Sequence, residues 1–250
     1  MNYPFLLTDS QWDEVSAYFE PKKRKRKVAL QVIVSALIYV LKTGCQWRLL
    51  PAAYGRGPLV YYYFRKWMAF GVLEDMLYKL VRKIRIQQGR NAEPTAAVID
   101  TQSIKNASGV SEQTGYDGGK KVKGRKRSLA TDTQGNALAV GVSAASAHDK
   151  GAVLSVRQQV EDYRSIATIF ADGAFKGTAP FDRSGKIKWK IVNKKAGSFK
   201  VLPKRWVVER TFGWFTNFRR LAKDYEKRVE CAKAIILLAC IFITVNKLIT

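Results

Sequence analysis

Two short apolar runs in this chain each end on an aspartate, and together they constrain the fold more than any other feature. "TAAVID" ends on Asp100 and "TIFAD" ends on Asp172. Short apolar runs rich in β-branched residues are typical of buried strands. A solvated turn at a strand end would explain one such aspartate. Two of them predict carboxylates at the same edge of a sheet, where open α/β domains form their sites.

The charge of the chain indicates a polyanionic partner. There are 44 lysines and arginines against 20 acidic residues in 250, a formal net charge of +24. Nucleic acid is the first candidate and an anionic membrane surface the second. Cys45, Cys231 and Cys240 are scattered and form no C-x-x-C pair, which fits a reducing compartment better than a disulfide scaffold.

The chain before Pro94 is patterned as helices. Thr8 and Asp9 are candidate N-caps before an apolar series at helical spacing, and a strongly apolar helix is expected to end at Gly44. Two more helices follow, one containing "YYYFRKW", whose Arg65 and Lys66 are candidate phosphate contacts in a helix-turn-helix-like module. Residues 1–88 therefore predict a small, basic, all-helical DNA-binding domain, and residues 89–94 a polar linker.

The chain after Pro94 mixes strands and helices. Asp132 to Asn136 predicts a hairpin turn, "KIKWKIV" a strand, and the segment from Pro203 a long helix. His148 is the only histidine and is expected to be structural. The apolar run 234–245 is shorter than a membrane span needs and predicts a buried core helix, with a tail anchor as the alternative. Residues 95–250 thus predict an α/β domain.

A third carboxylate, Glu209, lies among bulky apolar residues on the predicted long helix. That setting would bury Glu209 beside the sheet; the alternative is a surface glutamate paired with a neighbouring arginine. Three clustered carboxylates repel one another unless they hold divalent cations, and hard oxygen ligands suit Mg²⁺. Two such ions a few ångström apart serve in-line phosphodiester chemistry. With the positive charge, the expected substrate class is nucleic acid.

A lysine- and glycine-rich segment, "GYDGGKKVKGRKR", lies between the first strand and the hairpin. It is expected to be a loop whose mobile cations follow a DNA backbone beside the site; the alternative is a flexible solvated loop. The candidate DNA contacts there are Lys120, Lys121, Lys123, Arg125, Lys126 and Arg127.

The order of these motifs, from "VIDTQSIK" through "IFADGAFKG" to "PKRWVVERTFGWFTNFRRLAKDYE", resembles the DDE transposases of bacterial IS5-type insertion sequences, within the IS4-like group. The resemblance covers nearly the whole chain. It implies an RNase H-like catalytic fold, a mixed sheet flanked by helices, behind the helical domain. It also implies that Asp100, Asp172 and Glu209 are the catalytic, metal-binding triad, so that Asp100 ends its strand because it holds the metal.

The resemblance also assigns Arg205, four residues before Glu209, to the arginine of the family's Tyr-Arg-Glu-Lys signature. The tyrosine and lysine of that signature fall on Leu202 and Thr216, with Arg219 as a stand-in for the lysine, and many relatives carry a histidine at Ser128. These departures bear on DNA-end handling and leave the triad in place.

The function that the resemblance implies is a DNA transposase. It would bind terminal inverted repeats and use two Mg²⁺ ions, or Mn²⁺ as a substitute, to cut strands and join a 3′-hydroxyl to target DNA. The expected assembly is a homodimer in the bacterial cytoplasm, associated with the nucleoid and not with a membrane. The alternatives are a metal-dependent nuclease without strand transfer and a domesticated or inactive copy that only binds DNA.

Overall fold

The computed structural model describes residues 5–19, 26–177, 185, 187–192 and 206–249. Six strands form one mixed sheet in the order β2-β3-β1-β5-β6, with β4 paired to β3. β1 is antiparallel to β3 and parallel to β5, and β5 is parallel to β6. The strands are β1 (Ala96–Lys105), β2 (Gly115–Asp117), β3 (Val122–Thr131), β4 (Ala137–Ala144), β5 (Thr168–Ala171) and β6 (Lys188–Ile191).

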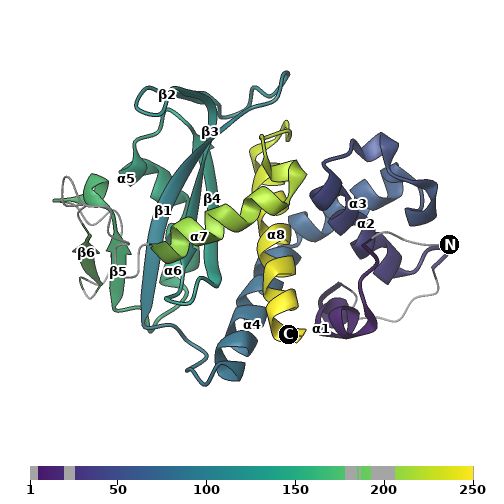
Figure 1. The fold of residues 1–250 in the computed structure, drawn as a ribbon, viewed down its shortest axis with the longest axis horizontal. Helices are drawn as coiled ribbons and strands as arrows, with labels where there is room; N and C mark the ends of the chain where they lie inside the picture. The colour runs from purple at the N-terminus through teal and green to yellow at the C-terminus, as the bar shows by residue number, and fades with distance from the viewer. Residues whose placement is uncertain (1–4, 20–25, 178–184, 186, 193–205, 250) are drawn as a thin grey trace.

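Helices precede and flank this sheet (Figure 1). The α-helices are α1 (Asp9–Phe19), α2 (Leu30–Thr43), α3 (Gly57–Ala69), α4 (Val72–Gln87), α5 (Asp149–Ala152), α6 (Arg157–Glu161), α7 (Trp206–Trp214) and α8 (Val229–Ile249). Short 3₁₀ turns join them: η1 (Trp47–Leu49), η2 (Ala52–Tyr54), η3 (Val153–Val156), η4 (Gly173–Phe175), η5 (Phe215–Asn217) and η6 (Arg219–Leu221). The expected α/β fold, a mixed sheet flanked by helices behind a helical region, is confirmed.

The ends of the first two helices follow from local chemistry. The Thr8 hydroxyl accepts from the Gln11 N–H at 3.2 Å, and the Gln11 side chain accepts from the Thr8 N–H at 2.9 Å. This reciprocal pair is a capping box at the start of α1. At the end of α2, Gly44 has φ 71° and donates to the Val40 carbonyl, a conformation that favours glycine. Both predicted helix boundaries are confirmed.

Helix α8 joins the helical region to the sheet. It packs against α4, α2 and β4, and one continuous apolar core includes side chains from α1 to α4, the sheet and α8. By length and composition α8 could cross a membrane, but 67% of its most apolar stretch is buried inside the protein. The prediction of a buried core helix is therefore confirmed.

The two faces of the sheet are covered by different parts of the chain. Side chains alternate between faces along a strand. On one face, α7 packs on β1 and β3, and Arg127 of β3 donates to the Leu221 carbonyl in η6. On the other face, Ser128 of β3 donates to the Ala152 carbonyl in α5, beside η3 and α6. The side chains of β1 and β3 can thus be assigned to a face by their sequence parity.

The predicted long helix from Pro203 is wrong within the described residues. Helix α7 has nine residues and gives way to two 3₁₀ turns, separated by Phe218 in an extended conformation. Tertiary packing overrides the helical spacing here. Phe218 and Leu221 are buried, and the Arg220 guanidinium donates to the Cys45 carbonyl at 3.1 Å, which holds η6 against the end of α2.

The predicted hairpin turn after β3 is confirmed and is a buried polar centre. Asp132 is fully buried and accepts hydrogen bonds from the Gln134 and Asn136 N–H groups and the Asn136 side chain. The Arg85 guanidinium of α4 reaches the same carboxylate at 2.5 Å. This ion pair ties the helical region to the tip of the hairpin.

We predict that Arg85→Met destabilises the fold by about 3 to 5 kcal/mol, because it leaves the Asp132 charge buried without its partner. Lys79→Met is the matched control on the same helix: its pair with Asp75 is half exposed, at 52% and 55%, and should cost less than about 1 kcal/mol. Urea unfolding at neutral pH measures both. Equal losses of unfolding free energy in the two variants would show that the buried pair stabilises the fold no more than the exposed pair does.

Candidate active site

Asp100 lies inside β1 and not at its end. The strand continues to Lys105, and Asp100 is paired across the sheet with Leu129 of β3. The prediction that Asp100 terminates its strand is wrong, because the antiparallel ladder with β3 continues for five more residues of β1. Parity puts Asp100 on the same face as Arg127, the face that α7 covers. One carboxylate oxygen accepts from the Thr101 N–H at 2.8 Å.

Asp172 follows the last residue of β5 and begins η4. Its side chain accepts from the Ala174 N–H at 3.0 Å, so the carboxylate caps this turn. The parallel register pairs Val98 with Phe170. Continued by two residues, the same register puts Asp172 beside Asp100, and neighbouring strands lie about 4.8 Å apart. This register agrees with the expectation that Asp100 and Asp172 lie close together in the sheet.

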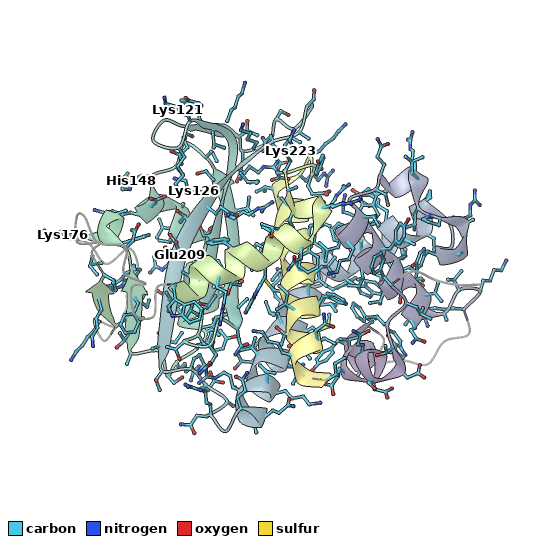
Figure 2. All side chains as sticks on the ribbon, in the orientation of Figure 1. Lys121, Lys126, His148, Lys176, Glu209 and Lys223 are labelled. Carbon is cyan, nitrogen blue, oxygen red and sulfur yellow. The ribbon has the colours of Figure 1, made fainter. Side chains whose placement is uncertain are left out.

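Glu209 lies on α7, which crosses the same face of the sheet (Figure 2). Val207, Val208 and Phe212 are buried beneath the helix, while Glu209 is exposed. The prediction that apolar neighbours would bury Glu209 is wrong, because the helix directs its valines to the sheet and Glu209 away from that contact.

Helix α7 is held in position by its contacts with the hairpin turn. Arg210 lies between the rings of Trp206 and Trp214, 4.3 and 4.8 Å from their centroids, and donates to the Gln134 carbonyl. Gly135 has φ 85°, and a Cβ there would lie 3.2 Å from the Thr211 hydroxyl. Glycine is therefore needed for this close approach of the turn to α7.

The three carboxylates fit a divalent cation in their chemistry. They are hard oxygen donors of the kind that Mg²⁺ prefers, two in adjacent register positions and the third on the helix that crosses their face. In the described part of the chain, however, no three His, Cys, Asp or Glu side chains gather closely enough to hold a metal ion. The three carboxylates are thus assigned to one face of the sheet, but they are not close enough together in this structure to form a metal site.

The expectation of a mobile cationic loop at 115–127 is wrong for its second half. Residues 122–127 belong to β3, and Arg125, Lys126 and Arg127 are buried, with exposed fractions of 0%, 4% and 4%. These three predicted DNA contacts have internal partners. Lys120, Lys121 and Lys123 are exposed, as a DNA-binding role requires.

Arg125 connects three segments beneath the sheet. Its guanidinium donates to the Asp224 carboxylate at 3.0 Å and to the carbonyls of Glu112, Glu226 and Lys227. Arg127 donates to the Leu221 carbonyl, and burial lowers its pKa to about 10, an effect that Asp224 opposes. Sequence reasoning missed these partners: "KDYEK" after the signature supplies the Asp224 carboxylate and two of the carbonyls that Arg125 binds.

Lys126 lies on the opposite face, in a polar network. Its ammonium donates to the Asp149 carboxylate at 2.8 Å and lies 3.5 Å from Asp117. Asp149 also accepts from the Thr101 hydroxyl at 2.7 Å, and Asp117 accepts from the Ser103 hydroxyl at 2.5 Å. The Ser103 bond, with the Lys120 N–H and the Lys126 charge, lowers the pKa of Asp117 to about 2.

The remaining predicted residues have varied settings. Arg65 is half-buried and Lys66 exposed on α3, while Arg205 lies outside the described residues. His148 is the N-cap of α5 and accepts from the Lys150 N–H at 3.4 Å, which agrees with a structural role. Ser128 is buried.

Comparison with known proteins supplies the context for this arrangement. Residues 91–243 match the family described as "Transposase DDE domain", and residues 7–77 match "Putative transposase of IS4/5 family". The chain belongs to the IS4/5-family DDE transposases. The implied RNase H-like fold agrees with the observed sheet, and membership of the family makes the protein a DNA transposase by class.

Two similar curated proteins come from an insertion element of Burkholderia cepacia. The "Putative transposase for insertion sequence element IS402" is 29% identical over 138 residues, 50% of this chain and 64% of that protein. The "Insertion element IS402 uncharacterized 16.2 kDa protein" is 29% identical over 109 residues, 40% of this chain and 73% of that protein. No solved structure matches the chain at a significant level.

We predict that Arg125→Met lowers the free energy of unfolding by about 3 to 5 kcal/mol, since it leaves Asp224 unpaired and several carbonyls without a donor. Lys123→Met, two residues earlier on the same strand but exposed, should change stability by less than about 0.5 kcal/mol. Urea unfolding of the two variants makes the comparison. If Arg125→Met were as stable as the wild type, the structural role of Arg125 would be contradicted and it would again be a candidate for DNA contact.

We predict a second, pH-dependent effect at Asp117. Its folded pKa of about 2 lies below the ordinary value of 3.8, so its contribution to stability is fully present above pH 4 and is lost as pH falls toward 2. Asp117→Asn should lower the free energy of unfolding at neutral pH and flatten its acid dependence between about pH 4 and 2. Chemical unfolding at several pH values tests this, and an unchanged slope would contradict it.

Proposed function

We propose that this transposase binds the terminal inverted repeats of an insertion sequence, cuts their strands with Mg²⁺ or Mn²⁺, and joins the freed 3′-hydroxyl to target DNA. The observation that carries the proposal is the β1–β5 register: it pairs Val98 with Phe170 and, continued by two residues, aligns Asp172 with Asp100, on a strand that the helix bearing Glu209 packs against. The family of the chain and its net charge of +24 support DNA as the substrate.

The three acids would serve as metal ligands with different roles. Asp100, in the middle of the sheet, would bind both ions, while Asp172 and Glu209 would each complete one. Bound ions of this kind activate the attacking oxygen and stabilise the leaving oxygen of an in-line displacement. The Thr101 and Ala174 N–H groups help to orient the two aspartates, since each donates to one oxygen of its carboxylate.

The expected DNA contacts lie in two places. Lys120, Lys121 and Lys123 are exposed at the end of the sheet beyond Asp100, where cations can pair with backbone phosphates. In the helical domain proposed for residues 1–88, Lys66 is exposed on α3 and Arg65 lies beside it. Arg205, which lies outside the described residues, is a further proposed DNA contact.

The proposed assembly follows from the reaction. Two element ends must be cut and joined together, which a homodimer accomplishes with one catalytic domain, residues 95–250, for each end. The substrate is chromosomal DNA, so the protein would act in the bacterial cytoplasm at the nucleoid.

We predict that Asp172→Asn lowers strand cleavage by on the order of 1,000-fold, because removing a metal ligand forfeits several kcal/mol of transition-state stabilisation. Asp100→Asn and Glu209→Gln should have similar effects. The assay is nicking of a supercoiled plasmid that carries the DNA flanking this gene, with Mg²⁺ or Mn²⁺ and with EDTA.

Asp75→Asn on the exposed face of α4 is the matched control and should cleave like the wild type. DNA binding should survive in all variants. Full cleavage by any triad variant would remove that residue from the site. Tight binding without cleavage by the wild type would support a copy that only binds DNA, and cleavage without joining of a pre-cut end would support a nuclease.

A further inference from the structure

A cavity of about 480 Å³ lies at the end of the sheet, between the segment that follows β1 and the β2–β3 hairpin. Its polar lining side chains are Lys105, Asn106, Ser108, Thr114, Tyr116, Lys121 and Lys123. None of the three triad acids lines it. Lys105 is five residues beyond Asp100 on β1, so the cavity begins about 17 Å from that carboxylate at the usual rise of a strand.

The walls of this cavity are fixed by backbone hydrogen bonds. The Ala107 N–H donates to the Asp224 carbonyl at 2.7 Å, and the Asn106 N–H donates to the Lys123 carbonyl at 3.3 Å. Arg125 binds the Glu112 carbonyl from beneath. The segment after β1 is therefore tied both to β3 and to the chain between η6 and α8, which holds the cavity in one shape.

The side chains in the cavity combine three kinds of chemistry. Lys105, Lys121 and Lys123 are exposed cations, and Figure 2 shows Lys121 at the outer end of the hairpin. Tyr116 presents a ring that is 57% exposed, although it belongs to a strand. The Asn106 side-chain oxygen is buried and has no hydrogen-bond partner.

These three groups match the three parts of an unpaired nucleotide. Cations pair with its phosphate, an exposed ring stacks on its base, and an amide pairs with the edge of the base. A duplex backbone would need only the cations, because its base faces are already stacked on one another. The exposed ring and the unpartnered side-chain oxygen of Asn106 therefore favour an unpaired strand over a duplex.

We propose that this cavity binds an unpaired nucleotide of the DNA strand that passes the acidic triad, with Tyr116 as the stacking residue. The proposal rests on the proposed function, since it assigns a second position to the same substrate. A separation of about 17 Å corresponds to about five nucleotides of a duplex strand at 3.4 Å each. The cavity would thus hold a strand that has opened a few nucleotides from the cleaved bond.

The test is binding of a labelled single-stranded oligothymidine and of a labelled duplex of mixed sequence, measured by fluorescence anisotropy in EDTA. Tyr116→Leu should weaken single-strand binding by about 5- to 150-fold, the usual contribution of one stacked base, and change duplex binding less than about twofold. Tyr116→Phe keeps the ring and should bind the single strand like the wild type.

Separate controls test the contribution of charge to single-strand binding and the folding of the variants. Lys121→Gln should weaken single-strand binding, whereas Lys79→Gln on α4 removes the same charge outside the cavity and should not. Circular dichroism checks that Tyr116→Leu is folded, which its exposed ring leads us to expect.

Wild-type single-strand affinity in Tyr116→Leu, or an equal loss for single strand and duplex, would overturn the proposal. A loss in Tyr116→Phe as large as that in Tyr116→Leu would also overturn it. Because the assay contains no metal, these results do not depend on whether the triad cleaves DNA.

Discussion

The buried guanidinium of Arg125 is the interaction on which the two functional regions of the sheet depend. Asp224 pairs with it and the carbonyls of residues 226 and 227 accept from it, which ties the chain after η6 to strand β3. That connection restricts the conformation of the segment between α7 and α8. It also anchors the Glu112 carbonyl and, through Asp224, the Ala107 N–H. One buried cation therefore supports both the helix that carries Glu209 and the wall of the lysine-lined cavity.

The parallel pairing of β1 with β5 provides the second constraint. Asp100 and Asp172 are 72 residues apart in sequence, but the register that aligns Val98 with Phe170, continued by two residues, puts Asp172 beside Asp100. A slip of one residue would turn one aspartate to the opposite face, where Lys126 already neutralises Asp149. The two faces hold different polar groups: Lys126 pairs with Asp149 on the α5 face, while the α7 face holds the Arg125–Asp224 pair and Asp100.

Much of the fold follows from local sequence signals, and the errors have identifiable physical causes. The capping box at Thr8, the left-handed Gly44 and the Asp132 turn are decided by residues within four positions of one another, so the sequence predicts them well. The end of α7 is decided by packing on α2, and the exposure of Glu209 by which side of the helix meets the sheet. Those contacts join segments that are distant in the sequence, so the spacing of apolar residues within one segment does not predict them.

The basic segment after β2 shows why charge alone overstates the DNA-binding surface. Lysines 120, 121 and 123 are exposed, whereas Arg125 and Arg127 point to one buried face and Lys126 to the other. The planar guanidinium can satisfy several carbonyls and a carboxylate at once, so arginine suits a buried multidentate position, while a lysine ammonium is more strongly hydrated. Part of the net charge of +24 is therefore structural. The cations available to DNA are those that remain once the internal partners of each arginine have been counted, and at this end of the sheet they are the lysines around Tyr116.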